Sequence, residues 1–141
     1  MSTETNKAFI RRFVDEAINR RNAAAIDQMV AEDFLEHVPL PGQGSGREGL
    51  KQAVAMLLHA FPDMRWTIEE QVAEGDKVVS RFAWTGTQQG EFMGIKPRGA
   101  KVSMWGVVID VVRDGQFVES RIIMDSLGLL QQLGAIPLPS P

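Results

Sequence analysis

The chain has 141 residues and a net charge of -3, from 15 Lys and Arg against 18 Asp and Glu. A hydrophobic fraction of 44% suffices for a packed core, so we expect a single domain over residues 1–141 with a frayed tail at 135–141. Cysteine is absent, which excludes disulfides, thiolate nucleophiles and cysteine-bound metals. The negative charge argues against nucleic acid as a partner. Because neither a signal peptide nor a bilayer-spanning apolar run is found, we expect a soluble, cytoplasmic protein without a membrane partner.

Three amphipathic segments in the first half of the chain predict helices. Apolar residues recur at helical spacing over residues 8–18, and the Ala-rich residues 23–30 form a second such segment. Ser45-x-x-Glu48 has the pattern of a capping box, which predicts that a third helix begins there. Pro62 cannot continue that helix. Its apolar positions are Leu50, Ala53, Val54, Leu57, Leu58 and Phe61.

The second half of the chain changes to the two-residue alternation of β-strands. The pairs Gly75-Asp76 and Asp114-Gly115 predict tight turns, and a longer loop at 88–99 joins the middle strands. We therefore expect an antiparallel meander of strands at 65–73, 77–87, 101–113 and 116–124, and then a short helical region at 127–133. This order predicts an α+β fold, in which three N-terminal helices and a cone-shaped, curved antiparallel or mixed sheet enclose a cavity.

Several short motifs resemble one known family. They are Phe61-Pro62-Asp63, Gly75-Asp76-Lys77-Val78-Val79 with Arg81, Gly86-Thr87-x-x-Gly90-Glu91-Phe92-x-Gly94-Ile95, Asp114-Gly115 and Gln131-Gln132-Leu133-Gly134. In order and spacing they resemble the SnoaL-like polyketide cyclases (ester cyclase type) of the nuclear transport factor 2-like superfamily. The resemblance implies the same cone-shaped fold, an activity such as aldol cyclisation or hydroxylation, and a dimer or tetramer.

The resemblance also implies where catalytic groups would lie. The family's cyclases carry an Asp in the final strand, a His on the neighbouring strand and an Asn soon after the second helix. Aligning the turn motifs puts those positions at Ile122, Val108 and Glu36, and Gln88 stands in place of a loop His. Because Ile and Val cannot transfer protons, the resemblance predicts the scaffold but not the cyclase acid/base pair.

Asp110 is the first candidate for a catalytic base. If Val108 and Ile122 face the cavity, strand alternation places Asp110 on the same face. Its neighbours in sequence are apolar, so its pKa would rise toward the range of a general base. The alternative is a structural ion pair of Asp110 with Arg113 or Arg81.

Asp125 and His37 are the other candidate catalytic residues. Asp125 also has apolar neighbours, but it lies where a strand becomes a helix and could instead be a helix N-cap. His37 could polarise a substrate carbonyl, or it could simply form a hydrogen bond beside the proline-containing loop. Two histidines on separate elements predict no metal site, and no cofactor is expected.

The candidate substrate-binding residues are Arg81, Trp84, Val108, Ile122, Met124 and Met56. The Trp and Met side chains could line a pocket or fill the core. Arg81 could also lie between two carboxylates, by analogy with limonene epoxide hydrolase. These residues favour a cofactor-independent enzyme that acts on a hydrophobic, carbonyl-bearing, polyketide-like molecule by carboxylate acid/base chemistry. The alternative is a non-catalytic binding or assembly module on the same fold.

One strand also predicts an interface. Trp105, Val107, Ile109 and Val111 would make its outer face apolar, and a monomer would leave that face exposed. We therefore expect a homodimer or a higher homo-oligomer.

Overall fold

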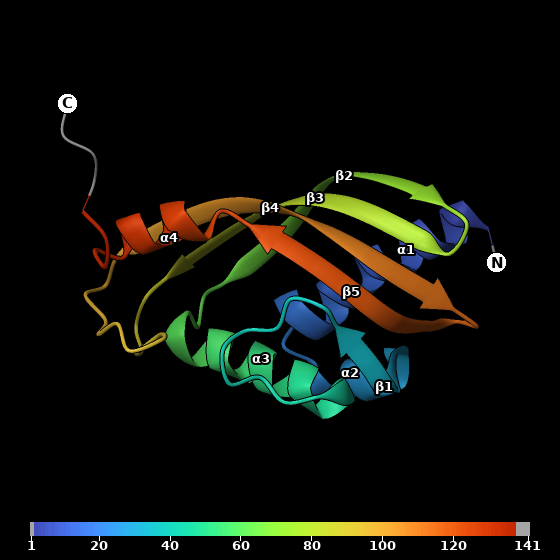
Figure 1. The fold of residues 1–141 in the computed structure, drawn as a ribbon, viewed down its shortest axis with the longest axis horizontal. Helices are drawn as coiled ribbons and strands as arrows, with labels where there is room; N and C mark the ends of the chain where they lie inside the picture. Colours follow the sequence, from blue (N-terminus) through green and yellow to red (C-terminus); the bar gives the residue numbers. More distant parts are fainter. Residues whose placement is uncertain (1, 138–141) are drawn as a thin grey trace.

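The computed structural model describes residues 2–137. Helices lie on one side of a single five-stranded sheet, and a short helix lies at one end of it (Figure 1). The helical elements are α1 (Thr3–Phe13), the π-helix η1 (Val14–Asn19), α2 (Ala23–Met29), α3 (Gly46–Ala60) and α4 (Ser126–Gln132). The strands are β1 (Val30–Glu36), β2 (Arg65–Glu74), β3 (Lys77–Thr87), β4 (Lys101–Arg113) and β5 (Gln116–Met124). The expected α+β class is confirmed, with α4 as a fourth α-helix.

The sheet has the order β1-β5-β4-β3-β2. Strands β2 to β5 form the expected antiparallel meander, and β1 pairs with β5 in parallel, so the sheet is mixed. Asp114 and Gly115 both have positive φ, 50° and 74°, which matches the twist of a two-residue hairpin. Two of the three connections in the meander are therefore tight turns, the third is the loop at 88–100, and β1 pairs with a strand that is remote in sequence.

Strand β1 is absent from the sequence prediction, which ends the second helix at Val30. Ile26, Met29 and Val30 fit a helical face, but α2 ends at Met29 and Val30 begins the strand. Val30 pairs with Phe117, 87 residues later in the chain. A strand of seven residues that pairs with a remote strand gives no clear two-residue alternation of apolar residues. The local sequence pattern therefore could not distinguish a strand from a helix at this place.

The helix starts differ in how they are capped. Ser2 caps α1 through a hydrogen bond from the Thr5 amide. Ser45 occupies the N-cap position of α3, but its side chain makes no capping hydrogen bond. Glu48 instead pairs with Lys51 at 3.3 Å, so the predicted capping box gives the correct start without the expected contacts.

The core lies between the helices and the inner face of the sheet. Helix α1 packs on β2 and β3, whereas α3 packs on β1. Helix α4 packs against β4, where the Gln132 side chain pairs with both the amide and the carbonyl of Ser103 at 2.8 and 2.7 Å. Of the predicted tail at 135–141, residues 138–141 lie outside the described part of the chain.

Candidate functional site

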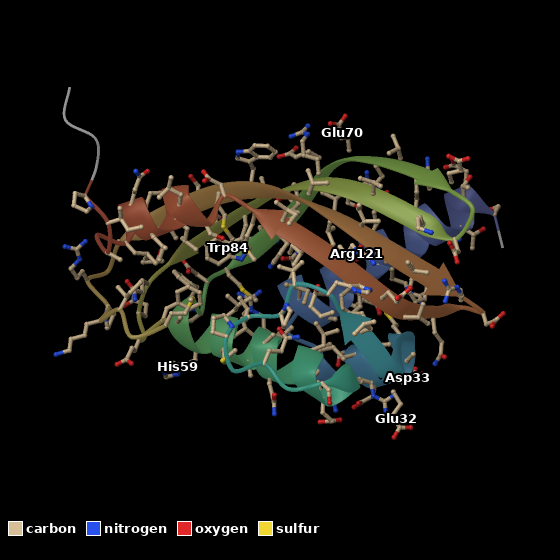
Figure 2. All side chains as sticks on the ribbon, viewed as in Figure 1. Glu32, Asp33, His59, Glu70, Trp84 and Arg121 are labelled. Carbon is tan, nitrogen blue, oxygen red and sulfur yellow. The ribbon has the colours of Figure 1, made fainter. Side chains whose placement is uncertain are left out.

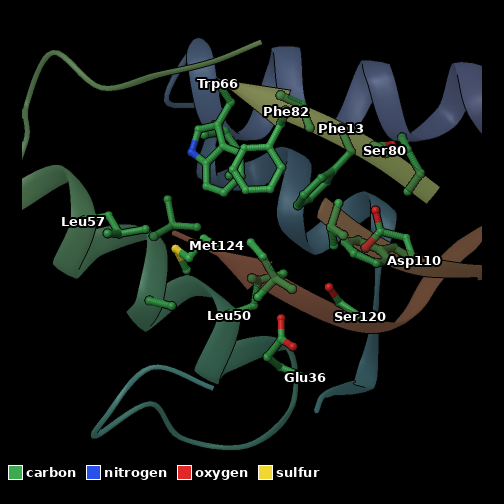
Figure 3. Close-up of a pocket in the computed structure, with 18 of the residues that line it drawn as sticks. Phe13, Glu36, Leu50, Leu57, Trp66, Ser80, Phe82, Asp110, Ser120 and Met124 are labelled. Atoms are coloured by element: carbon green, nitrogen blue, oxygen red, sulfur yellow. The ribbon is translucent and has the colours of Figure 1, made fainter. Parts of the chain in front are cut away.

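A cavity of about 140 Å³ lies between the helices and the inner face of the sheet (Figure 3). That volume has room for on the order of ten water molecules. A ligand about as large as a bicyclic ring would therefore fit. Most of its wall is apolar. The apolar lining residues include Val108, Ile122 and Met124 on the sheet, Leu50 and Leu57 on α3, and Phe13 on α1.

Four polar side chains gather on one part of this wall: Glu36, Ser80, Asp110 and Ser120. The sheet register brings them together, because Ser120 on β5 pairs with Glu36 on β1 and with Asp110 on β4. Side chains that are opposite in a sheet lie within about 5.5 Å at their Cβ atoms. Ser120 therefore lies between two carboxyl groups.

Asp110 is 3% exposed, and its Oδ1 atom has no hydrogen-bond partner among the described residues. Burial raises the pKa of Asp110 from 3.8 to about 8, because the charged form loses its hydration. The Ser120 hydroxyl opposes this shift, and the negative charge of Glu36 adds to it. Asp110 therefore changes its charge close to neutral pH.

Glu36 is the second carboxyl group. Burial also raises its pKa above the ordinary 4.5, although the Val38 amide and the Ser120 hydroxyl stabilise the charged form. The Val38 amide donates to Glu36 Oε2 at 3.0 Å. The hydroxyl of Ser120 carries one proton and can donate it to only one of the two carboxyl groups at a time.

Trp66 lines another part of the cavity, across from the carboxyl groups (Figure 3). Its ring packs on Phe82, with the centroids 4.3 Å apart at 39°. The Asn19 side chain holds the Trp66 backbone, donating to its carbonyl at 2.8 Å and accepting from its amide at 2.9 Å. The indole Nε1 is buried without a partner in the described part of the chain.

Four of the residues predicted from sequence line the cavity: Asp110, Val108, Ile122 and Met124. The alternative for Asp110, an ion pair with Arg113 or Arg81, is wrong. Arg113 pairs with Asp76 at 2.8 Å, and Arg81 pairs with Glu70 at 2.8 Å.

Five predicted site residues lie elsewhere. Asp125 is the N-cap of α4, because its Oδ1 accepts from the Gly128 amide at 3.0 Å. His37 contacts Glu119 at 3.1 Å and is not part of the cavity wall. Arg81 lies with Glu70 on the sheet face away from the helices (Figure 2), which also removes the arrangement of Arg81 between two cavity carboxylates. Trp84 is core, with its ring edge-on to Phe61, and Met56 lines a separate surface pocket with His59.

Sequence reasoning missed two groups on the wall. Glu36 appears there only as a mismatch to the family's Asn, although it lies two residues after buried Phe34 and so shares its face of β1. Trp66 is not among the substrate-binding residues predicted from the sequence. Its role depends on which way the indole nitrogen points, and no sequence pattern reports that.

Within residues 2–137, no group of three or more His, Asp or Glu side chains lies close enough to hold a metal ion. The cavity wall, as far as the structure describes it, carries no Lys, Arg or His. No helix in the same range has the length and apolar character needed to cross a membrane. The polar groups of the cavity wall are thus two carboxyl groups, two hydroxyl groups, the Gln43 side-chain amide and an indole N–H, in apolar surroundings.

Solved structures similar to this chain have the same fold. TsrD from Streptomyces laurentii has a TM-score of 0.86 and 29% identity, covering 96% of this chain and 99% of its own. AclR, a candidate hydroxylase from Streptomyces galilaeus, has a TM-score of 0.85 and 30% identity, covering 99% and 87%. IdmH, a candidate polyketide cyclase from Streptomyces antibioticus, has a TM-score of 0.80 and 31% identity, covering 92% and 98%. A search of curated protein sequences found no match.

The family comparison agrees with the fold and with the sequence motifs. The model of the family described as "SnoaL-like polyketide cyclase" matches residues 8–133. That range runs from α1 through α4 and includes every strand and the whole cavity wall. On this match the chain belongs to the SnoaL-like polyketide cyclase family.

Proposed function

We propose that the cavity binds an uncharged, hydrophobic, carbonyl-bearing molecule of the polyketide type, and that Asp110 acts on it as a general acid and base. One observation carries the proposal: a buried carboxyl group with an unpartnered oxygen lies on the wall of a largely apolar cavity. The ionisable side chains on that wall are Asp110 and Glu36. Both repel an anionic ligand when they are ionised, which argues against an anionic ligand.

The proposed chemistry is proton transfer at carbon. With a pKa of about 8, Asp110 is available near neutral pH in both its acid and its base form. The carboxylate takes the proton from a carbon next to the ligand carbonyl, and the electron pair of that C–H bond forms an enolate. The resulting carboxylic acid then returns a proton to the carbon or the oxygen, so the protein is unchanged.

This proposal does not extend to ring closure. The positions that the resemblance assigns to the cyclase acid/base pair are Val108 and Ile122, which pair with each other across β4 and β5. Both line the cavity without a polar atom in their side chains. That observation favours a second candidate function, in which the cavity binds its ligand and performs no chemistry.

Deuterium exchange of 2-tetralone distinguishes the two functions. This bicyclic ketone has acidic protons at C1, and their loss in D₂O can be followed by proton NMR. We expect the wild type to accelerate the exchange, with a rate that rises with pH to a midpoint near 8. Asp110→Asn should lower the protein-dependent rate by roughly a hundredfold or more.

The matched control is Asp125→Asn, which removes a carboxyl group outside the cavity and leaves an asparagine, also a good N-cap. It should exchange 2-tetralone at the wild-type rate. Binding of 2-tetralone without accelerated exchange would contradict the base role and support the binding module. Equal rates in wild type and Asp110→Asn would contradict the assignment of Asp110.

We also propose that the chain forms a homodimer through the face of the sheet that is turned away from α1, α2 and α3 (Figure 1). Trp105 and Ile123 on that face are 57% and 65% exposed, and Ile123 pairs with half-buried Val107. Arg81 and Glu70 add charges of both signs to this face, so the same surface of a second copy related by a two-fold axis can be complementary to it. Val111, predicted on the same face, is only 2% exposed and adds no exposed apolar surface to it.

Light scattering coupled to size exclusion tests the dimer. The wild type should elute with twice the monomer mass at micromolar concentration, and Ile123→Lys should elute as a monomer because it places a charge in the apolar face. Leu127→Lys is the control, since Leu127 is equally apolar and 59% exposed but lies on α4. A monomeric wild type would overturn the dimer.

A further inference from the structure

The indole nitrogen of Trp66 is a buried hydrogen-bond donor that the fold leaves without a partner among the described residues. Such groups are rare in folded proteins, because a buried donor loses its hydrogen bond to water. This donor belongs to a side chain that lines the cavity. In Figure 3 the nitrogen lies on the side of the indole ring toward Leu57, another lining residue.

The ring is also held in place. Both backbone polar groups of Trp66 are bonded to the Asn19 side chain, and one face of the ring packs on Phe82. A donor fixed in this way is preorganised, so a ligand that bonds to it does not have to order the side chain first. A ligand oxygen that reaches this nitrogen from the cavity would relieve the unpartnered donor.

Trp66 and the carboxyl pair lie far apart along the sheet. Trp66 pairs with Trp84 on β3, and Asp110 pairs with Val78 on the same strand. These two β3 positions are six residues apart, which corresponds to roughly 20 Å between their Cα atoms along an extended strand. The side chains of Trp66 and Asp110 extend from the backbone at that separation. The carbonyl whose neighbouring carbon meets Asp110 therefore cannot also reach Trp66.

We propose that the Trp66 indole N–H is a specificity-determining donor, which binds a second oxygen of the ligand at the end remote from the reacting carbonyl. This assignment rests on the proposed function, because it takes the cavity as the ligand site and Asp110 as the reacting end. The ligand class is thereby narrowed to neutral ring ketones that carry an ether, hydroxyl or carbonyl oxygen at the opposite end.

Two matched probes test the assignment. In 6-methoxy-2-tetralone the ether oxygen lies on the ring carbon para to the one that bears C1, so it points away from the exchanging protons. In 6-ethyl-2-tetralone a methylene group of similar shape replaces that oxygen. By calorimetry we expect the wild type to bind the methoxy compound roughly 3- to 10-fold more tightly, the worth of one net hydrogen bond.

Trp66→Phe keeps an aromatic ring and removes the donor, so its preference for the methoxy probe should fall to about one. Trp84→Phe is the matched control, because Trp84 Nε1 is also buried and unpartnered in the described part of the chain but does not line the cavity. Trp84→Phe should keep the wild-type preference. An unchanged preference in Trp66→Phe would overturn the assignment.

A spectroscopic measurement needs no folded Trp66 variant. The chain has three Trp residues, so three indole N–H signals are expected in a nitrogen–proton correlation spectrum, and Trp84→Phe with Trp105→Phe assigns the third to Trp66 by elimination. The methoxy probe should shift the Trp66 signal downfield, and the ethyl probe should leave it nearly in place. Equal shifts with both probes would contradict the assignment.

The outcomes also separate this inference from the proposed function. In one outcome, exchange at C1 depends on Asp110 but Trp66→Phe keeps the wild-type preference for the methoxy probe. That outcome overturns the Trp66 assignment alone. If neither probe binds the wild type, the cavity is not the ligand site, and the assignment of Trp66 fails with it.

Discussion

The same residue type has different properties at three positions in this fold. Hydrogen bonds from the side chain and the amide of Thr87 lower the pKa of Asp63, and the Arg113 guanidinium lowers that of Asp76. Asp110 has no such cation among residues 2–137, and burial raises its pKa. Apolar neighbours in the sequence correctly predicted a buried Asp110. The same criterion fails for Asp125, because its real partner is the free end of a helix that begins one residue later.

The raised pKa of Asp110 predicts a pH-dependent stability. Between 3.8 and about 8 the folded protein keeps a proton that the unfolded chain has released. The native state therefore loses stability as pH rises through this window, by at most about 1.4 kcal/mol per pH unit. Asp110→Asn has no carboxyl proton to release at this position. Its free energy of unfolding, measured relative to that of the wild type, should therefore increase from pH 5 to pH 8.

Urea unfolding of both proteins at several pH values measures this difference. Carboxyl groups remote from the cavity titrate alike in the two proteins, so the difference isolates Asp110 together with its coupling to Glu36. Parallel stability curves over this pH range would show that Asp110 is ionised at its ordinary pKa in the folded protein.

Asp125 supports a prediction about stability alone. Asp125→Ala removes the hydrogen bond to the Gly128 amide and should lower the free energy of unfolding by about 1 kcal/mol. Ser45→Ala is the control, because Ser45 occupies an N-cap position without a side-chain hydrogen bond, and its effect should be smaller. The rate of 2-tetralone exchange should be unchanged in Asp125→Ala. A loss of exchange would show that Asp125 takes part in the reaction.

At the scale of elements, local signals predicted most of the fold. Helical spacing predicted α1 and α3, and the Asp114-Gly115 turn predicted the hairpin of β4 and β5. Strand β1 was missed because its partner β5 is remote in sequence. The missed strand carries Glu36, so the error in the fold became an error in the site.

The junction between η1 and β2 links an irregular element to the cavity. Asn19 ends the π-helix and pairs with both backbone polar groups of Trp66, while Val14 and Ile18 of η1 line the cavity. The π-helix thus places the Asn19 side chain where it forms hydrogen bonds with the backbone of β2 at the edge of the sheet. π-helical turns often occur at functional sites.

Asn19→Ala removes two hydrogen bonds and should lower the free energy of unfolding by roughly 1–3 kcal/mol. It should also weaken the preference for 6-methoxy-2-tetralone, because the Trp66 backbone is then free to move. Asn22→Ala serves as the control, since Asn22 precedes α2 without a side-chain capping bond. If thermal unfolding and probe binding are the same in both variants, Asn19 does not position Trp66.

At the scale of the whole molecule, the cavity is formed by the packing of the helices on the sheet. The sequence predicted some of the residues that line it but not all of them. Alternation correctly placed Val108, Asp110 and Ile122 on one wall. It could not show that Arg81 lies on the opposite face, that Trp84 is in the core, or that Met56 belongs to the other side of α3. Those positions depend on how the helices sit against the curved sheet.

The charge of the whole cavity predicts which ligands it accepts. Its wall, as described here, has two carboxyl groups and no basic side chain, so burying an anionic ligand leaves its charge without a partner. We expect 2-acetylnaphthalene to bind at least tenfold more tightly than 2-naphthoate at pH 8 by calorimetry. Equal affinities, or a preference for the acid, would show that a cation reaches the ligand.

A carbon-13 NMR titration of the aspartate side chains tests whether Asp110 is a protonatable carboxyl group inside the cavity. The signal that disappears in Asp110→Asn belongs to Asp110. We expect this signal to titrate with a midpoint near 8 and the midpoint to move when 2-tetralone is added. A midpoint at or below the ordinary value of 3.8, unaffected by 2-tetralone, would show that Asp110 is not the acid/base group of the cavity.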